Sequence, residues 1–214
     1  EVERRFLQVM PQDCLANIVH NCFGGRRTID GDFRVLVAGG GTGHASTFLA
    51  EQLQHYGARV TYIDLSSASM RVAKRRAAIR ALDNIDWYSG SLLDLPRMGL
   101  GPFDYINCTG VLHHLADPTA GLEALKAVLK SDGALGLMVY ARYGRQSYYH
   151  VQKLMRLLRE AADSPEERIE MCQKAMLELP ETFFLGHGIR RESHLKGFFG
   201  DPINLFDTFL HSQD

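Results

Sequence analysis

Long apolar runs, clustered cysteines and an excess of charge of one sign are all missing from this sequence of 214 residues. No apolar segment approaches the roughly 18 residues that a membrane-spanning helix needs, and no signal-peptide pattern opens the chain. The four cysteines are scattered, without metal-binding spacing or a dense disulfide framework. A net charge of −1 disfavours a protein that wraps nucleic acid or coats an anionic membrane. We therefore expect a cytoplasmic protein without a membrane segment or a metal site.

The composition is that of a globular protein. Hydrophobic residues make up 45% and charged residues 23%, so the chain can bury a substantial core. Its length fits one α/β domain with a modest appendage. The sequence begins without Met and ends at Leu210–Asp214 without a closing element, so we expect a fragment of a longer protein.

Short β-rich segments alternate with helical segments between residues 34 and 140. Spacings of roughly 20–30 residues between strands indicate a doubly wound, mostly parallel sheet with helices on both faces. The carboxyl ends of such strands share one edge, where ligands bind near the switch in strand order. The predicted strands are 34–38, 59–64, 85–88, 103–107 and 135–140, and the predicted helices are 45–56, 67–82 and 119–130.

Three regions follow from this pattern. Residues 1–33 are predicted to form a short helix over 12–21 and a linker, and residues 34–147 the ligand-binding α/β domain. Residues 148–214 are predicted to form a helical appendage or lid, with helices over 148–162 and 165–179. Its phenylalanines would pack the appendage onto the domain, cover the ligand-binding edge of the sheet or join two subunits. These residues are Phe183, Phe184, Phe198, Phe199, Phe206 and Phe209.

A glycine loop, Gly39-Gly40-Gly41-Thr42-Gly43, connects the first predicted strand to the next helix. Glycines allow positive φ and a close approach of a ligand to the main chain, and the helix N-terminus offers unpaired N–H groups. Asp64 ends the second strand about 20 residues later, where a carboxylate accepts hydrogen bonds from both hydroxyls of an unphosphorylated ribose. The combination indicates a site for a ribose-bearing nucleoside cofactor and leaves its identity open.

The segment Val35–Gly43 resembles the first motif of class I S-adenosylmethionine-dependent methyltransferases. Asp64 matches the ribose-binding acid of that family, and Gly90–Pro96 is similar to the segment where the adenine sits. Phe103–Leu115 and Leu129–Tyr140 are similar to the family's fourth and fifth strands with their loops. The resemblance covers residues 34–140, half of the chain, and implies a methyltransferase with S-adenosylmethionine as its cofactor. It does not identify the methyl acceptor.

The resemblance also assigns the cofactor-binding residues, which lie at the carboxyl ends of the first four strands. They are Ala38, Gly39, Gly40, Gly41, Thr42, Gly43, Asp64, Leu65, Ser91, Leu92 and Thr109. Two positions depart from the family pattern. Many members carry an acid at the place of Val37, where it orients the glycine loop or contacts the amino end of the cofactor. Another acid, which reaches the adenine amino group, is replaced by Ser91, whose hydroxyl can accept one hydrogen bond.

Methyl transfer from a sulfonium needs alignment of the reacting atoms more than a fixed set of catalytic side chains. Our candidate catalytic residues are His113 and His114, which follow the fourth strand, and Tyr140 at the end of the fifth. A histidine there could act as a general base near neutral pH, or could shape the loop by hydrogen bonding to the backbone. Arg142, Tyr143 and Arg145 could bind an anionic or aromatic acceptor instead of forming a solvated turn.

The end of the fourth strand, Asn107-Cys108-Thr109-Gly110, lacks the Asn/Asp-Pro-Pro-aromatic run of enzymes that methylate exocyclic amines of bases or protein glutamine. The basic residues of the third predicted helix are interpreted as a solvated face, because no interleaved aromatic residues accompany them. These are Arg71, Lys74, Arg75, Arg76 and Arg80. The acceptor is therefore expected to be a small molecule or a protein side chain.

Two alternatives stay open. The first is a non-catalytic domain that binds S-adenosylmethionine or a partner, since Val37 departs from the family and the chain looks truncated. The second is an NAD(P)-dependent short-chain dehydrogenase, suggested by the pair Tyr149 and Lys153. Ala45 stands where the dehydrogenase glycine pattern needs another Gly, which weighs against this alternative. His187, His194 and Cys172 show no metal-ligand spacing.

Overall fold

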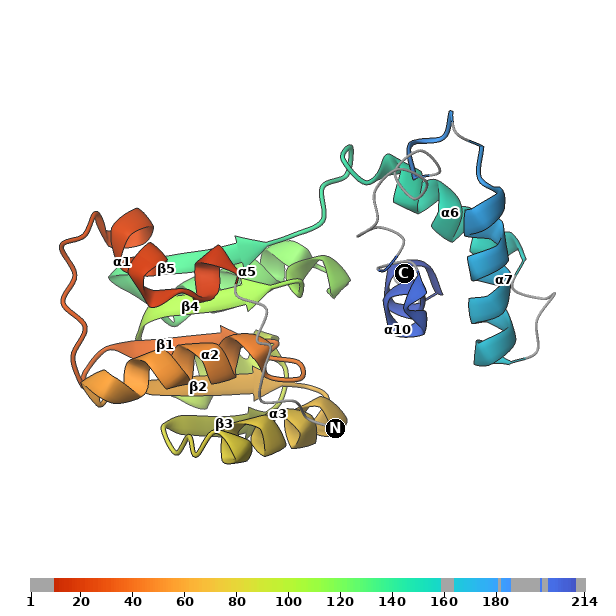
Figure 1. Ribbon diagram of the computed structural model, residues 1–214. Helices are drawn as coiled ribbons and strands as arrows, with labels where there is room; N and C mark the ends of the chain where they lie inside the picture. Colours follow the sequence, from red (N-terminus) through yellow and green to blue (C-terminus); the bar gives the residue numbers. More distant parts are fainter. Residues whose placement is uncertain (1–9, 159–163, 181, 186–196, 198–199, 211–214) are drawn as a thin grey trace. The chain divides into compact units, whose positions relative to one another are not determined.

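The computed structural model describes residues 10–158, 164–180, 182–185, 197 and 200–210 (Figure 1). The chain forms two compact units, residues 1–139 and residues 140–214. None of the described helices is long and apolar enough to cross a bilayer.

The first unit is built on a five-stranded parallel sheet with the strand order β3-β2-β1-β4-β5, which confirms the predicted fold class. The chain moves outward from β1 through β2 to β3 and then returns to the other side of β1. The strand order therefore switches between β1 and β4, and the carboxyl ends of these two strands form the edge where doubly wound sheets hold ligands. The strands are β1 (Arg34–Ala38), β2 (Arg59–Asp64), β3 (Ile85–Ser89), β4 (Phe103–Thr109) and β5 (Leu129–Met138).

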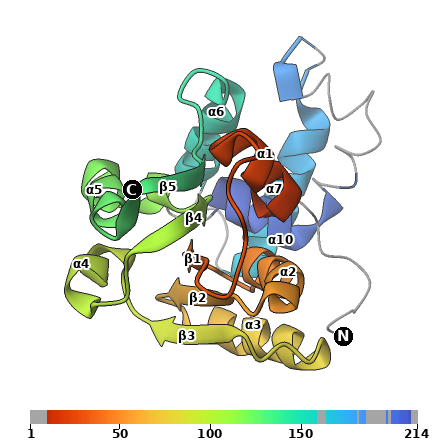
Figure 2. The ribbon, with the colours of Figure 1, turned by 90° about the vertical axis from the view of Figure 1, so that its left-hand side faces the viewer.

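Helices cover both faces of the sheet, as Figure 2 shows. Helices α1 (Leu15–Phe23), α2 (His44–Leu53) and α3 (Ser67–Ile79) lie on one face, and α4 (Leu95–Met98) and α5 (Pro118–Ala127) lie on the other. Short 3₁₀ turns complete the connections: η1 (Pro11–Asp13), η2 (Gln54–Tyr56), η3 (Leu92–Asp94) and η4 (Leu112–His114).

Each face of the sheet contributes to its own hydrophobic core. Val35 and Val37 of β1 pack beneath the first group of helices, whereas Leu36 and Ala38 pack on the opposite face. Successive side chains of a strand point to opposite faces, so a strand buried on both must be apolar throughout. This explains why the sequence of β1 after Arg34 is an uninterrupted apolar run.

The largest differences between the observed and the predicted helix and strand boundaries occur at two places. The helix predicted to reach residue 82 ends at Ile79, because Ala81 takes a left-handed conformation with φ of +53°. The helix predicted to reach residue 130 ends at Ala127, and β5 begins at Leu129 instead of residue 135. Pairing with β4 across a register irregularity draws the polar residues after Leu129 into the strand and overrides their weak strand preference.

Two smaller differences concern the N-terminal helix and the end of the fifth strand. The N-terminal helix predicted over 12–21 is divided into η1 and α1, and α1 ends where Gly24 adopts φ of +58°. The fifth strand ends at Met138, so Tyr140 lies beyond the strand and belongs to the second unit.

The second unit contains α6 (Gln146–Leu157), α7 (Pro165–Glu178), α10 (Pro202–Leu205) and η6 (Phe206–Leu210), a π-helical turn. Ser164 and Glu167 form a capping box that begins α7. The core of this unit includes Met155, Cys172 and Phe209. Phe183 packs partly against this core, and Phe184 and Phe206 are exposed. Phe198 and Phe199 lie outside the described residues.

One buried carboxylate joins three parts of the first unit. Asp104 of β4 is 1% exposed and accepts hydrogen bonds from the Arg34 amide (2.9 Å) and from Lys130 Nζ (2.8 Å). The Arg27 guanidinium of the linker also pairs with it. Burial alone would raise the pKa of Asp104, but the Arg34 N–H and the charges of Lys130 and Arg27 outweigh it, so the pKa lies below its usual value.

Replacing Asp104 by Asn should lower the free energy of unfolding at pH 7 by about 2–4 kcal/mol, because two cations lose their buried partner. A carboxyl group with a lowered folded-state pKa contributes stability above its ordinary pKa of about 4 and loses it as the pH falls further. Urea unfolding at pH 7 and pH 3 should therefore show a difference between wild type and Asp104→Asn that shrinks at pH 3. Equal stabilities at pH 7 would contradict this role.

Candidate functional site

The glycine loop leaves β1 at Ala38 and enters α2 at His44. Its backbone needs glycine for two different reasons. A Cβ at Gly39 would lie 2.4 Å from Val111 Cγ2, and one at Gly43 would lie 2.6 Å from Ala73 Cβ, so both sites are closed by packing. Gly41 has φ of +52° and no heavy atom within 4 Å of an added Cβ. Gly41 therefore faces open space, which is the surface a ligand of this loop would approach.

The Asp64 carboxylate at the end of β2 is held by two backbone amides. Oδ2 accepts a hydrogen bond from the Gly41 N–H (2.7 Å), and Oδ1 accepts one from the Ser66 N–H (2.7 Å). Each carboxylate oxygen has two lone pairs and so retains one acceptor position. The side chain is thus oriented beside the glycine loop and can still accept two further hydrogen bonds.

The predicted residues that follow β2 and β3 lie at the same edge of the sheet. Leu65 is 72% exposed directly after Asp64. Ser91 caps η3, where its hydroxyl oxygen accepts a hydrogen bond from the Leu93 N–H (3.2 Å), and Leu92 is buried beneath it. The hydroxyl group of Ser91 can still donate a hydrogen bond. Contacts of Ser91 or Leu92 with a bound base stay a prediction.

Two residues that the sequence analysis missed lie at the end of β4. Gln12 Nε2 donates a hydrogen bond to Thr109 Oγ1 (3.3 Å), and Asn107 Nδ2 donates one to Asp13 Oδ1 (2.6 Å). Asp13 is 4% exposed, and burial raises its pKa despite the hydrogen bond from Asn107. Asn107 is the β4 partner of Val37. A carboxyl group therefore does lie near the ends of β1 and β4, supplied by η1 and not by β1.

A basic residue of α3 also contacts the glycine loop. Arg76 Nη1 donates hydrogen bonds to the carbonyl oxygen (2.9 Å) and the hydroxyl oxygen (3.1 Å) of Thr42. Arg80 pairs with Glu51 at 3.0 Å. These two residues depart from the expected solvated face, whereas Arg71, Lys74 and Arg75 are exposed as expected.

The structure brings His113 and His114 together in η4, with ring centroids 4.2 Å apart. They follow β4 through Gly110, whose φ is +75°. His114 is exposed and His113 is half-buried. Tyr140 lies in the second unit, where the Arg145 guanidinium stacks on its ring at 3.5 Å from the centroid.

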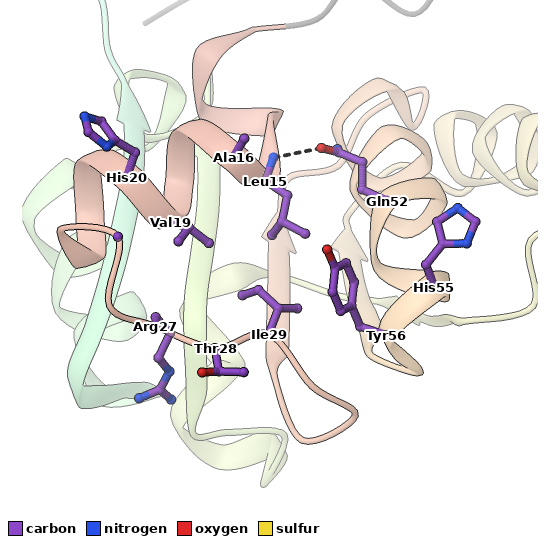
Figure 3. A pocket seen from close by; sticks show the side chains of 11 residues that line it. Leu15, Ala16, Val19, His20, Arg27, Thr28, Ile29, Gln52, His55 and Tyr56 are labelled. Atoms are coloured by element: carbon purple, nitrogen blue, oxygen red, sulfur yellow. Dashed lines mark hydrogen bonds between the residues drawn. The ribbon is translucent and has the colours of Figure 1, made fainter.

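A separate groove of about 890 Å³ lies between α1, the following linker and η2 (Figure 3). Apolar side chains such as Leu15, Ile29 and Tyr56 line it, and its lining includes no residue of the glycine loop or of the strand ends. The groove is therefore distinct from the candidate cofactor site. The described residues contain no group of three or more His, Cys, Asp or Glu side chains that could hold a metal ion, and His187 and His194 lie outside them.

Residues 36–135 match the family model of a methyltransferase domain. An uncharacterised protein of Synechococcus is 40% identical over 184 residues, which are 85% of this chain and 43% of that protein. A ubiquinone biosynthesis O-methyltransferase of Xanthomonas axonopodis is 36% identical over 109 residues, or 51% of this chain and 44% of that enzyme. The chain thus spans less than half the length of either relative.

Solved structures show the same fold. PKMT2 from Rickettsia typhi, solved in complex with AdoHcy, aligns with a TM-score of 0.72 at 20% identity and covers 97% of this chain and 40% of that one. An S-adenosylmethionine-dependent methyltransferase from Clostridium acetobutylicum aligns with a TM-score of 0.53 at 17% identity over 69% of this chain and 55% of that one. With the family model and the sequence relatives, they confirm the resemblance. Residues 36–135 therefore form a class I S-adenosylmethionine-dependent methyltransferase domain, whose cofactor is S-adenosylmethionine.

Proposed function

We propose that this protein transfers the methyl group of S-adenosylmethionine to a small molecule or a protein side chain. The observation that carries the proposal is the Asp64 carboxylate, which two backbone amides hold beside a glycine loop whose Gly41 faces open space. When bound, S-adenosylmethionine supplies an electrophilic methyl group. The residues of this chain would bind the cofactor, orient it and keep water away from the reacting atoms.

The site fits the cofactor in its charge and in its open surface. The free acceptor positions of Asp64 suit two ribose hydroxyls, whereas a phosphorylated ribose would bring a second negative charge against this carboxylate. The exposed Leu65 offers apolar surface beside Asp64, which suits one face of the nucleoside. We assign Ser91 and Leu92 to the base and the backbone from Ala38 to Gly43, with Thr109, to the remainder of the cofactor.

Replacing Asp64 by Ala should weaken binding of S-adenosylhomocysteine by about 1–3 kcal/mol, because two hydrogen bonds to a charged acceptor are lost. Isothermal titration calorimetry of the whole chain measures this change. Asp30→Ala is a matched control, since the exposed Asp30 carboxylate also accepts a backbone hydrogen bond, from the Asp32 N–H at 3.1 Å. Unchanged affinity in Asp64→Ala would contradict the assigned role.

The class of acceptor is inferred from three observations. The end of β4 lacks the Asn/Asp-Pro-Pro-aromatic run of enzymes that methylate base amines. A relative of this chain is a ubiquinone biosynthesis O-methyltransferase, which supports a small molecule with an oxygen acceptor. Arg71, Lys74 and Arg75 are exposed without interleaved aromatic residues along α3, so they do not indicate a surface for nucleic acid.

A hydroxyl acceptor must lose a proton during methyl transfer, and we assign this step to the histidines that follow β4. His114 is exposed just after the carboxyl end of β4, where an acceptor could reach it. The ring of His113 lies beside the ring of His114 and supports it. Tyr140 is proposed as a further catalytic or acceptor-binding residue.

If His114 is the general base, replacing it by Ala should lower the methyl-transfer rate by roughly 10²–10⁴-fold without changing the affinity for S-adenosylhomocysteine. Rate measurements at saturating cofactor, combined with calorimetry, separate the two effects. His20→Ala, in the separate groove, is the control and should retain the wild-type rate. A wild-type rate in His114→Ala would show that this histidine only shapes the loop.

A second candidate function is a non-catalytic binding domain, which the replacement of the family acid by Val37 favours. Labelled S-adenosylmethionine incubated with the full-length protein and cell extract distinguishes the two functions. We expect label in the small-molecule or protein fraction. Cofactor binding without any transfer would favour the non-catalytic function, and label in nucleic acid would contradict the proposed acceptor class.

Calorimetry on the same protein tests the alternative that it is a short-chain dehydrogenase. Tyr149 and Lys153 both lie within α6 of the second unit. Calorimetric titration with NAD and NADP should show no binding at concentrations that saturate the S-adenosylhomocysteine site. Preferential binding of a nicotinamide cofactor would overturn the proposed function.

A further inference from the structure

A buried tyrosine of β2 holds the glycine loop from below. Tyr62 is 0% exposed, and its hydroxyl donates a hydrogen bond to the carbonyl oxygen of Gly41 at 2.7 Å. Its ring packs directly against Gly40, where an added Cβ would lie 2.2 Å from Tyr62 Cε2. The ring is itself held by Trp87 of β3, with centroids 4.9 Å apart. The loop therefore lies on a rigid aromatic support.

Tyr62 and Asp64 form hydrogen bonds to the two polar backbone groups of the same residue, Gly41. The Gly41 carbonyl accepts from Tyr62, and the Gly41 N–H donates to Asp64 Oδ2. The two side chains are two residues apart on β2, so they project from the same face of the strand. Any movement of the Gly41 backbone would disturb both hydrogen bonds. The loop conformation and the orientation of the Asp64 carboxylate are therefore coupled.

The hydroxyl of Tyr62 remains a donor over the whole working range of pH. Burial raises its pKa above the ordinary value, and the nearby charge of Asp64 raises it further. Val37, by contrast, is buried and carries no polar group that could hold the loop from β1.

We propose that Tyr62 is a positioning residue that sets the glycine loop and the Asp64 carboxylate before the cofactor binds. It takes over, from β2, the orienting task that an acid at position 37 would perform from β1. The inference rests on the proposed function, because it assigns Tyr62 to the same cofactor site. A loop that is already ordered loses less conformational entropy on binding, so the gain appears as affinity for the cofactor.

Tyr62→Phe tests this role because it removes the hydroxyl and keeps the supporting ring. We expect S-adenosylhomocysteine to bind about tenfold more weakly, which corresponds to ~1.4 kcal/mol. Asn84→Ala is the control for a buried polar group outside the site: Asn84 is 6% exposed, and its Nδ2 donates to the backbone carbonyls of Ala50 (2.9 Å) and Ala58 (3.0 Å). Both variants should lose stability in urea unfolding, and only Tyr62→Phe should lose affinity.

Amide hydrogen exchange in the ligand-free protein gives a second readout. The Gly41 amide should be protected in wild type and in Asn84→Ala, and should exchange faster in Tyr62→Phe. Wild-type affinity or unchanged Gly41 exchange in Tyr62→Phe would overturn the inference and leave the proposed function intact. Failure of the wild-type protein to bind S-adenosylhomocysteine would instead overturn the proposed function, and this inference with it.

Discussion

The hydrogen bond between the Gly41 amide and the Asp64 carboxylate is the interaction on which the candidate cofactor site depends. It joins the loop after β1 to the end of β2, and it can form only because these strands are parallel neighbours whose carboxyl ends share one edge. The neighbouring Ser66 amide completes the support of the carboxylate. The fold thus supplies a charged acceptor in a fixed orientation, next to bare main chain.

Much of this arrangement could be predicted from local patterns. Short β-rich runs identified β1 to β4 within a few residues, and the signal is strongest for β1, because a strand buried on both faces is apolar throughout. The start of β5 was missed because it depends on the pairing of Leu129 with Phe103 of β4 and on the ion pair of Lys130 with Asp104. Such long-range pairing has no local signature, whereas the glycine loop and Asp64 have one.

The residues that support the site were harder to predict than those expected to contact the cofactor. Tyr62 reads as an ordinary core residue of a strand, and its hydrogen bond to Gly41 becomes visible only when β1 and β2 are paired. Gln12 and Asp13 lie more than 90 residues from their partners on β4. Arg76 stands in a basic run in which three other members are exposed. No pattern of sequence spacing distinguishes these residues from neighbours that are only solvated or only part of the apolar core.

The absence of an acid at position 37 consequently says less about function than its position in the motif suggests. An acid there is expected to orient the glycine loop or to contact the amino end of the cofactor. In this chain Tyr62 contacts the loop from β2, and the buried Asp13 carboxyl group accepts a hydrogen bond from Asn107, the β4 partner of Val37. Because both groups come from other segments, Val37 can remain in the apolar core without leaving the site unsupported. The support of the site therefore depends more on contacts from neighbouring segments than on the residue type at one position of β1.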